Sequence, residues 1–244
     1  IRSIFVPRPG YIFVHADASQ SELRILGFYT NEPVLVNAAN ENRDMHSANA
    51  EGIFGIDAKI FQYKAENRVV EIGSDGKPID YFKMRRDAKN IGFAWIYGAS
   101  TYKVYTMLEG RYSYQEVEEK EINYFKKFSN IKFWKSEIHR LADENHGNFY
   151  SCYGRRRGLT DLLSLEEELR LEPLAKAKKI GSKDYLYPSE HEIYEAHKAS
   201  LREGLNSIIQ GTSHDFIDLG LIEAYENIDN DRAFLLLETH DSCD

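Results

Sequence analysis

Asp17 and Asp241 lie near opposite ends of the 244-residue sequence, and each follows a run of strand-forming residues. Tyr11–Val14 is aromatic and β-branched and precedes the first aspartate, whereas Ala233–Glu238 precedes the second. Two aspartates at strand ends can act together only if folding places their strands side by side. The sequence therefore predicts a sheet that unites the two ends of the chain. Helical periodicity between them predicts a mixed fold of helices and strands.

The chemistry open to such a pair of carboxylates is the binding of divalent cations. Mg²⁺ takes hard oxygen ligands, usually one or two carboxylates together with water and substrate phosphates. Two ions about 3.5–4 Å apart can activate an attacking oxygen and stabilise a leaving one. The plain structural alternative is that each aspartate starts a turn or caps a helix, and it stays open for either residue taken alone.

A second constraint is the spacing of Arg85, Lys89, Phe93 and Tyr97 at four-residue steps. Such side chains share one face of a helix, over a length of about 18 Å. This length matches an extended nucleoside triphosphate, with cations toward the phosphates and aromatic rings toward the sugar and base. A surface helix with a basic first turn and a buried aromatic second half is the alternative. Gly92 costs this helix about 1 kcal/mol relative to alanine, which indicates that another group approaches its backbone.

Ser19 and Glu22 form the pattern S-x-x-E at the start of a helix that is expected over Ser19–Tyr29. In such a capping box the Glu22 side chain would reach back to the amide of Ser19. The same spacing places Glu22 about one turn from Asp17, at the edge of a nucleotide site. Both interpretations can hold together.

The composition limits the partners that the chain can have. A formal net charge of −8 disfavours nucleic acid, because phosphate contacts dominate such binding, although local clusters such as Arg155–Arg157 can still attract phosphates. The two cysteines lack the spacing of zinc ligands, and such low usage suggests a reducing compartment. No apolar run approaches the roughly 20 residues that cross a bilayer, so no membrane partner is expected.

The remaining periodic segments predict further elements of both kinds. Helices are expected over Asp44–Gly52, Lys83–Tyr97, Tyr114–His146 (one or two helices) and Ala199–Tyr225, and a hairpin is expected over Val69–Tyr81. Gly98 suits a left-handed cap at the end of the second of these helices. Leu162–Lys198 is dominated by charge and is interpreted as a solvated helical insertion.

Two further patterns are not interpreted as functional sites. His191-Glu192 followed by His197 is similar to a zinc-binding motif, but these histidines lie six residues apart and do not share a helix face. His214-Asp215 falls within a helical stretch and is expected to be a pair on the helix surface.

Taken together, these clusters resemble the motifs of the family A DNA polymerases, the bacterial DNA polymerase I type. The first family motif is a strand followed by an aspartate and S-Q-I-E-L-R, and here it reads Asp17-Ala18-Ser19-Gln20-Ser21-Glu22-Leu23-Arg24. The second is R-R-x-x-K-x-x-N-F-G-x-x-Y-G and is matched by Arg85, Arg86, Lys89, Phe93, Tyr97 and Gly98. The third is V-H-D-E and is matched by His240 and Asp241. Two lesser segments agree, YGRRRGL at 153–159 and LREGLNSIIQGTSHD at 201–215.

The resemblance implies a role for each matching residue. Asp17 and Asp241 would bind two Mg²⁺ ions, or Mn²⁺ in their place, with help from the Ala18 carbonyl. Arg85 and Lys89 would hold the triphosphate, and Lys89 would donate a proton to departing pyrophosphate. Glu22 would exclude a ribose 2′-hydroxyl. The remaining implied dNTP contacts are Gln20, Phe93 and Tyr97, and the implied contacts to DNA or to the terminal base pair are Arg202, Asn206, Gln210 and His240.

The resemblance also implies a fold, an activity and partners. The fold would be the α+β right hand of a polymerase, with an antiparallel palm sheet and a mostly helical fingers subdomain. The palm would take residues 1–37 and 161–244, with a charged insertion at about 162–198, and the fingers would take 38–160. The activity would be nucleotidyl transfer from dNTP to a primer 3′-OH on primer-template DNA, in replication or repair. The thumb and flanking domains would belong to a larger polypeptide. A bacterial or phage-infected cytoplasm is the expected location.

Three departures from the family pattern keep alternatives open. Gly92 and Ala94 replace the asparagine and glycine around Phe93, and Ser242 replaces the glutamate after Asp241. Single-subunit RNA polymerases can carry H-D-S at this point, but Glu22 argues against that class. A non-catalytic, nucleic-acid-binding relic of the polymerase fold is the other alternative. The separations between motifs exceed those of the family, which is consistent with insertions near residues 75 and 167.

Overall fold

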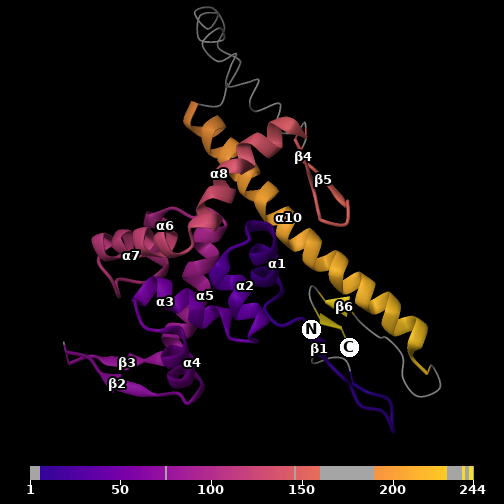
Figure 1. Ribbon diagram of the computed structural model, residues 1–244, viewed down its shortest axis with the longest axis horizontal. Helices are drawn as coiled ribbons and strands as arrows, with labels where there is room; N and C mark the ends of the chain where they lie inside the picture. The colour runs from indigo at the N-terminus through magenta and orange to yellow at the C-terminus, as the bar shows by residue number, and fades with distance from the viewer. Residues whose placement is uncertain are drawn as a thin grey trace, which may run out of the picture.

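The computed structural model describes residues 6–74, 76–145, 147–159, 190–229, 238–239 and 242–243. Within these ranges a group of helices packs to one side of the long helix α10, and a small sheet lies near the C-terminal part of α10, close to both chain ends (Figure 1). The helices are α1 Ser21–Thr30, α2 Pro33–Asn40, α3 Met45–Phe54, α4 Ala58–Glu66, α5 Tyr81–Ile96, α6 Thr101–Met107, α7 Tyr114–Lys127, α8 Ser129–Glu144 and α10 Glu190–Asn227. The strands are β1 Ala16–Asp17, β2 Val70–Ile72, β3 Pro78–Asp80, β4 Asn148–Tyr150, β5 Arg156–Gly158, β6 Glu238–Thr239 and β7 Ser242–Cys243. The predicted α+β class is confirmed.

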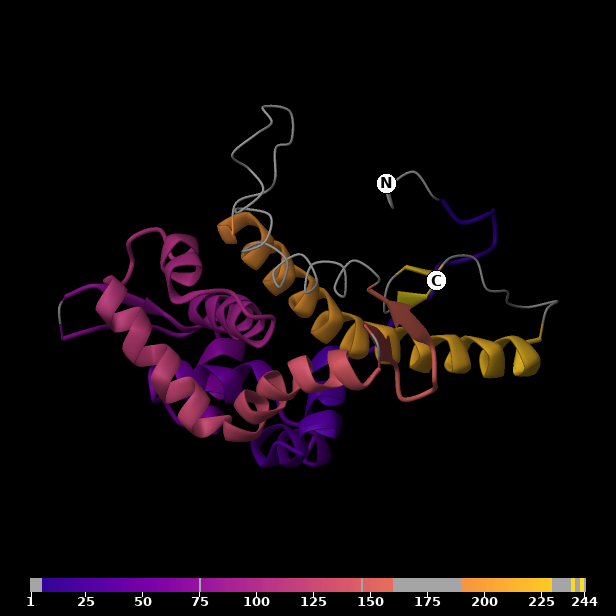
Figure 2. The ribbon, with the colours of Figure 1, turned by 90° about the horizontal axis from the view of Figure 1, so that it is seen from above.

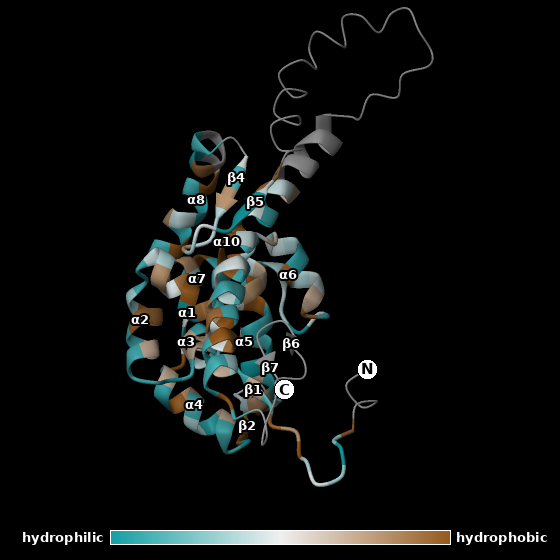
Figure 3. Ribbon diagram, turned by 90° about the vertical axis from the view of Figure 1, so that its right-hand side faces the viewer, coloured by the Kyte–Doolittle hydropathy of each residue, from teal (hydrophilic) through white to brown (hydrophobic). Residues whose placement is uncertain are grey.

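Helix α3 lies at the centre of the main core and packs against α4, α5 and α7. Its sequence MHSANAEGIF is rich in small residues, so neighbouring helices approach it from several sides. At Gly52 an added Cβ would lie 2.8 Å from the ring of Phe128, which shows how close this approach is. The largest fully buried side chains of this core include Trp95, Tyr124 and Phe61. In Figure 3 the hydrophobic residues of α3 and α5 gather where these helices meet.

A smaller core joins α8, the β4–β5 hairpin and α10. Phe149 of β4 is buried against Leu201 and Leu205 of α10. Gly204 allows this packing, because an added Cβ there would lie 2.6 Å from the Phe149 ring. Helix α1 also packs on α10, and the view from above shows α10 running from the helical group past the small sheet (Figure 2). This long helix therefore connects the helical group to the small sheet.

The sheet has the strand order β1-β7-β6, and all of its pairs are antiparallel. Ala16 lies opposite Cys243, and Asp17 lies opposite Ser242. The prediction that the two ends of the chain share a sheet is confirmed. The strand expected to end near Asp17 is present as the two-residue β1, and Tyr11–Val14 precede it outside regular secondary structure.

Most other elements match the sequence predictions. The helix over 44–52, the hairpin over 69–81 and the helix over 83–97 are present as α3, β2–β3 and α5. The long periodic stretch from 114 forms two helices, α7 and α8, as one of the two predicted options. Helix α10 starts at Glu190, earlier than predicted, so the last part of the expected insertion belongs to it. The rest of that insertion and residues 233–237 lie outside the described residues.

Candidate functional site

Helix α5 presents the four residues that the sequence placed on one face. The Asp80 side chain caps its first turn by accepting from the Lys83 amide at 3.0 Å, and Gly98 follows its end with φ +81°. The rings of Phe93 and Tyr97 stack almost parallel, with centroids 6.0 Å apart. The basic half begins with Arg85, and Lys89 is exposed. A cationic half and an aromatic half thus follow one another along the helix.

The charge of Arg85 is engaged by Asp44, the N-cap residue of α3. Its Nε and Nη2 donate to the two carboxylate oxygens of Asp44 at 2.8 and 2.6 Å. Burial by itself would raise the pKa of Asp44, but the hydrogen bonds from Arg85 and Ser47 outweigh it and hold that pKa below its usual value. This bidentate pair fixes the start of α3 against the second turn of α5. Sequence analysis did not predict it, because the two residues lie 41 positions apart.

His46 is a site residue that the sequence analysis missed. It lies two residues after the Asp44 cap, is 5% exposed, and its ring makes a T-shaped contact with Phe93, with centroids 5.8 Å apart. Its Nδ1 has no hydrogen-bond partner among the described residues. Burial lowers the pKa of His46 to about 4; Asp44 opposes this shift, and the nearby Arg85 and Lys89 add to it. A neutral imidazole therefore lies beside the two cations. The only sequence signal for this site residue was a single histidine near the predicted start of a helix.

The depressed pKa of His46 predicts a specific dependence of stability on pH. Because the unfolded histidine takes up a proton near pH 6.5 and the folded one only near pH 4, the contribution is present above pH 6.5 and is lost as the pH falls toward 4. We expect a loss on the order of 2–3 kcal/mol in the free energy of unfolding across this window. Denaturation at a series of pH values checks it, and His46→Phe should flatten the curve. A ring titration near pH 6.5, followed by NMR, would contradict the prediction.

Glu22 and Tyr97 bring α1 and α5 together at the aromatic end of this face. The Tyr97 hydroxyl donates to the Glu22 carboxylate. Burial raises the pKa of Tyr97, and the Glu22 charge raises it further, so the phenol remains a donor. The predicted capping box is wrong: the N-cap of α1 is Gln20 with φ 54°, and no side chain caps this helix. The left-handed Gln20 moves the helix start two residues beyond Ser19, and Glu22 turns toward Tyr97 instead of its own backbone.

Gln20 links the Asp17 segment to α3. Its side-chain oxygen accepts from the Met45 amide at 2.8 Å, next to the Asp44 cap. Asp17 itself is exposed at the end of β1, and Ala18 follows it. Asp241 and His240 lie outside the described residues, but β7, which starts directly after Asp241 in sequence, is paired with β1. In the strand order β1-β7-β6, the neighbour of β1 is the strand after Asp241 and not the strand before it, and the approach of the two aspartate side chains stays a prediction.

Gly92 is close to a neighbouring side chain, as its position inside a helix predicted. A Cβ added to Gly92 would lie 2.6 Å from Nδ2 of Asn49, which is fully buried on α3. Asn49 also accepts a long hydrogen bond of 3.4 Å from the Tyr124 hydroxyl. The amide of Asn49 therefore fills the space beside α5 that a side chain at position 92 would take.

We expect Gly92→Ala to destabilise the fold by about 1–2 kcal/mol, since overpacking outweighs the gain of about 1 kcal/mol in helix propensity. Gly220 of α10 is the matched control, because an added Cβ there meets nothing within 4 Å. Gly220→Ala should stabilise by about 0.5–1 kcal/mol. Chemical denaturation measures the stability of both variants. Adding Asn49→Ala to Gly92→Ala should restore part of the stability that Gly92→Ala loses. Equal effects of the two glycine replacements would show that the close approach is unimportant.

Arg202 faces the same end of α5 from α10. It lines an open cleft of about 950 Å³ together with Phe93, Tyr97 and Lys103. Its side-chain carbons would lie 3.1 Å from a Cβ at Gly98, so the left-handed glycine also gives Arg202 room. The structure therefore places Arg202 beside the aromatic half of α5.

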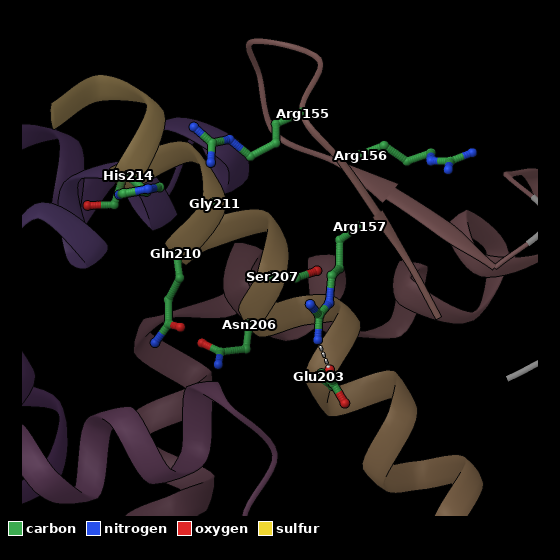
Figure 4. A pocket seen from close by; sticks show the side chains of 10 residues that line it. Arg155, Arg156, Arg157, Glu203, Asn206, Ser207, Gln210, Gly211 and His214 are labelled. Atoms are coloured by element: carbon green, nitrogen blue, oxygen red, sulfur yellow. Dashed lines mark hydrogen bonds and ion pairs between the residues drawn. The ribbon is translucent and has the colours of Figure 1, made fainter. Parts of the chain in front are cut away.

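Asn206 and Gln210 lie in a different cleft, of about 570 Å³, between α10 and the β4–β5 hairpin. Figure 4 shows these two side chains reaching from α10 below the arginines of the hairpin, with Arg157 paired to Glu203. Arginines 155–157 make this wall basic, although the chain as a whole is acidic. Three of the implied DNA contacts are therefore divided between two clefts along α10, and the fourth, His240, lies outside the described residues.

Asp215 anchors the arginine run, and the predicted surface pair His214-Asp215 is wrong. Asp215 is buried and accepts from the Ser151 hydroxyl and from Nε of Arg155. Arg155 also donates to Asp218 at 2.6 Å. Because Asp215 faces inward from α10, it ties the hairpin to the helix, and it is His214 that lies toward the cleft.

The donor set near Asp17 fits a hard divalent cation, because it consists of a carboxylate and the neighbouring Ala18 carbonyl. Across the described ranges no group of three or more acidic, histidine or cysteine side chains could hold a metal ion. A metal site at Asp17 therefore requires Asp241, water or substrate oxygens as further ligands. Within the same ranges no helix is long and apolar enough to span a membrane.

The strand β1 that ends in Asp17 and the helix α5, whose aromatic end meets the Glu22 carboxylate, carry residues of the motifs on which the polymerase resemblance rests. The family model for DNA polymerase family A matches residues 1–243. The chain therefore belongs to DNA polymerase family A.

Among curated proteins, the chain is 27% identical to DNA polymerase I of Caldicellulosiruptor bescii over 243 residues, which is 99% of this chain and 23% of that protein. It is 26% identical to the thermostable DNA polymerase I of Thermus aquaticus over 241 residues, again 99% of this chain and 23% of that protein. It is 28% identical to DNA polymerase I of Borreliella burgdorferi over 244 residues, or 99% of this chain and 21% of that protein. The chain spans less than a quarter of the length of these relatives.

A solved structure shares the fold. The POL domain of Pol1 from M. smegmatis, in complex with DNA primer-template and dNTP, aligns with a TM-score of 0.66 at 23% identity. The alignment covers 94% of this chain and 32% of that one.

Proposed function

We propose that the protein carrying this chain catalyses template-directed DNA synthesis, in which a primer 3′-hydroxyl attacks the α-phosphorus of a dNTP and pyrophosphate leaves. Family membership supports this reaction class. The single observation that carries it is the antiparallel pairing of β1, which ends in Asp17, with the strand that follows Asp241. This pairing brings together the sequence neighbourhoods of two aspartates that are more than 200 residues apart.

Asp17, Asp241 and the Ala18 carbonyl would hold Mg²⁺, or Mn²⁺ in its place. When bound there, two such ions supply activation of the attacking hydroxyl and stabilisation of the leaving oxygen. Asp17 supports this role because it is exposed at a strand end and makes no capping bond to a helix among the described residues. His240 would contact the primer terminus beside this centre.

The face of α5 would bind the incoming nucleotide. Lys89 is exposed and would pair with the triphosphate and give a proton to pyrophosphate. Arg85 would share its guanidinium between Asp44 and the phosphates, because a planar guanidinium offers more donors than the two that Asp44 uses. Gln20 would contact the nucleotide from the α1 side.

At the aromatic end, Phe93 would pack against the sugar and Tyr97 would border the templating position. Glu22, held by Tyr97, would occupy the space of a ribose 2′-hydroxyl and thereby select deoxynucleotides. This contact favours DNA synthesis over the RNA polymerase alternative, because an RNA polymerase must admit that hydroxyl.

The clefts along α10 would contact the primer-template through Arg202, Asn206 and Gln210. The basic wall at Arg155–Arg157 supports nucleic acid as the partner despite the acidic net charge. In this proposal residues 38–160, which contain α3 to α8, correspond to fingers, and residues 1–37 and 161–244, which contain α1, the small sheet and α10, correspond to palm. A thumb and flanking domains would complete the grip on DNA.

A primer-extension assay on the complete polypeptide that contains this chain tests the proposal. Extension that requires a template, a divalent cation and dNTPs is the expected result. DNA binding without extension would support the non-catalytic relic, for which Ser242 after Asp241 is the motivating departure. Preferential use of ribonucleotides would support the RNA polymerase alternative instead.

A further inference from the structure

Lys135 of α8 reaches across to the last turn of α5. Its Nζ donates to the main-chain carbonyl of Trp95 at 2.5 Å, and the ammonium lies 4.9 Å from the centroid of the Phe125 ring. The side chain is partly buried among α5, α7 and α8. Burial removes water from the lysine ammonium, and the contacts that the ammonium makes must offset this cost.

The carbonyl that Lys135 contacts marks the point where α5 ends. The last carbonyls of a helix lack helical partners, and a cation beside them is favourable. Trp95 also accepts from the Gly98 amide at 3.1 Å, and Gly98 is left-handed with φ +81°. The Trp95 carbonyl thus receives two donors, one from the turn that follows α5 and one from α8.

The segment that follows α5 is also held at its C-terminal end. Thr101, the first residue of α6, donates from its hydroxyl to Glu121 of α7 at 2.5 Å. Glu121 is also the carboxylate whose charge favours the protonated form of Lys135, while burial lowers the pKa of that lysine to about 8. The segment Tyr97–Ser100 is therefore fixed at both ends from α7 and α8.

Tyr97 lies two residues beyond Trp95 and donates to Glu22. We propose that Lys135 is a positioning residue, which holds the C-terminal turn of α5 so that the Tyr97 hydroxyl meets the Glu22 carboxylate. Its effect on sugar selection rests on the proposed function, whereas its effect on the turn does not. The alternative is that Lys135 only fills space between helices, and an apolar side chain of the same length would then serve equally well.

The first test is hydrogen exchange of the Gly98 and Ala99 amides in the complete polypeptide, without nucleotide. Lys135→Met keeps the length of the side chain and removes the donor, and it should speed this exchange by about ten-fold while amides in the middle of α8 stay unchanged. Lys135→Arg keeps a donor and should restore slow exchange. Lys132→Met is the matched control, because Lys132 lies on the same helix and is exposed. Unchanged exchange in Lys135→Met, or faster exchange throughout α8, would overturn the proposal.

The second test measures the ratio of ribonucleotide to deoxynucleotide incorporation, as kcat/KM, in the same variants. Lys135→Met should raise this ratio by about three- to ten-fold with little change in kcat for dNTP, and Lys132→Met and Lys135→Arg should not. If Lys135→Met does not fold, Lys135→Leu, which also lacks a donor and is less bulky, takes its place. An inactive polypeptide would refute the proposed function but leave the exchange result to decide the role of Lys135. A parallel fall in kcat for all nucleotides without a change in the ratio would overturn the positioning role.

Discussion

Replacing Asp17 with asparagine is expected to lower the rate of primer extension by about 10³-fold or more. Asp17 is exposed at the end of β1 and lies opposite Ser242, the residue that follows Asp241. Loss of one carboxylate from a site for divalent cations removes several kcal/mol of transition-state stabilisation, and about 1.4 kcal/mol corresponds to a factor of ten. Single-turnover primer extension at saturating dNTP measures the defect. Affinity for primer-template should change by less than about two-fold, since phosphate contacts are unaffected.

Asp57→Asn is the matched control for this substitution. Asp57 caps α4 by accepting from the amides of Lys59 and Ile60, and asparagine caps helices equally well. This variant should therefore extend primers at the unmodified rate. Asp241→Asn should show the same defect as Asp17→Asn. An Asp17→Asn protein as fast as the Asp57→Asn control would rule out the metal-binding assignment.

Replacing Glu22 with alanine is expected to raise the use of ribonucleotides relative to deoxynucleotides by about 10²-fold. The Glu22 carboxylate is fixed by the Tyr97 hydroxyl and is partly buried in the first turn of α1. Removing it opens space for a 2′-hydroxyl and removes a repulsive, poorly solvated contact, an effect of about 2–3 kcal/mol. The ratio of kcat/KM values for matched ribo- and deoxynucleotides is the measurement.

Two further variants distinguish the effect of the size of the Glu22 side chain from the effect of its position. Glu22→Gln keeps the size of the side chain and should retain most of the selection. Tyr97→Phe keeps the ring that stacks on Phe93 but removes the hydroxyl, so it should give an intermediate loss. If Glu22→Ala leaves the ratio unchanged, then Glu22 is not the sugar gate.

Local patterns in the sequence were sufficient to predict most of the helices. The α5 helix follows from its four-residue spacing, and its end follows from Gly98, because only glycine adopts φ near +81° without strain. The β2–β3 hairpin follows from β-branched residues around a turn. Such signals act over a few residues, so they can be read without knowing the rest of the fold.

Contacts between distant segments could not be predicted in the same way. The capping box of Ser19 and Glu22 satisfied every local rule, yet Tyr97 on another helix holds the Glu22 carboxylate. The sequence likewise gave no sign that Asp44 would pair with Arg85. These pairings depend on how the helices pack. The packing depends in turn on many small and buried residues that lie far apart in the sequence.

The sequence by itself determined the helix that carries Arg85 and Tyr97, the family to which the chain is similar, and the need for two strand ends to meet. Only the tertiary structure decided which partners these residues take. It set the register that places Asp17 opposite Ser242, turned Asp215 inward onto Arg155, and brought Lys135 to the end of α5. The physical reason is that periodicity and turn chemistry are properties of neighbouring residues. A hydrogen bond between helices forms only after the core has packed and water has left.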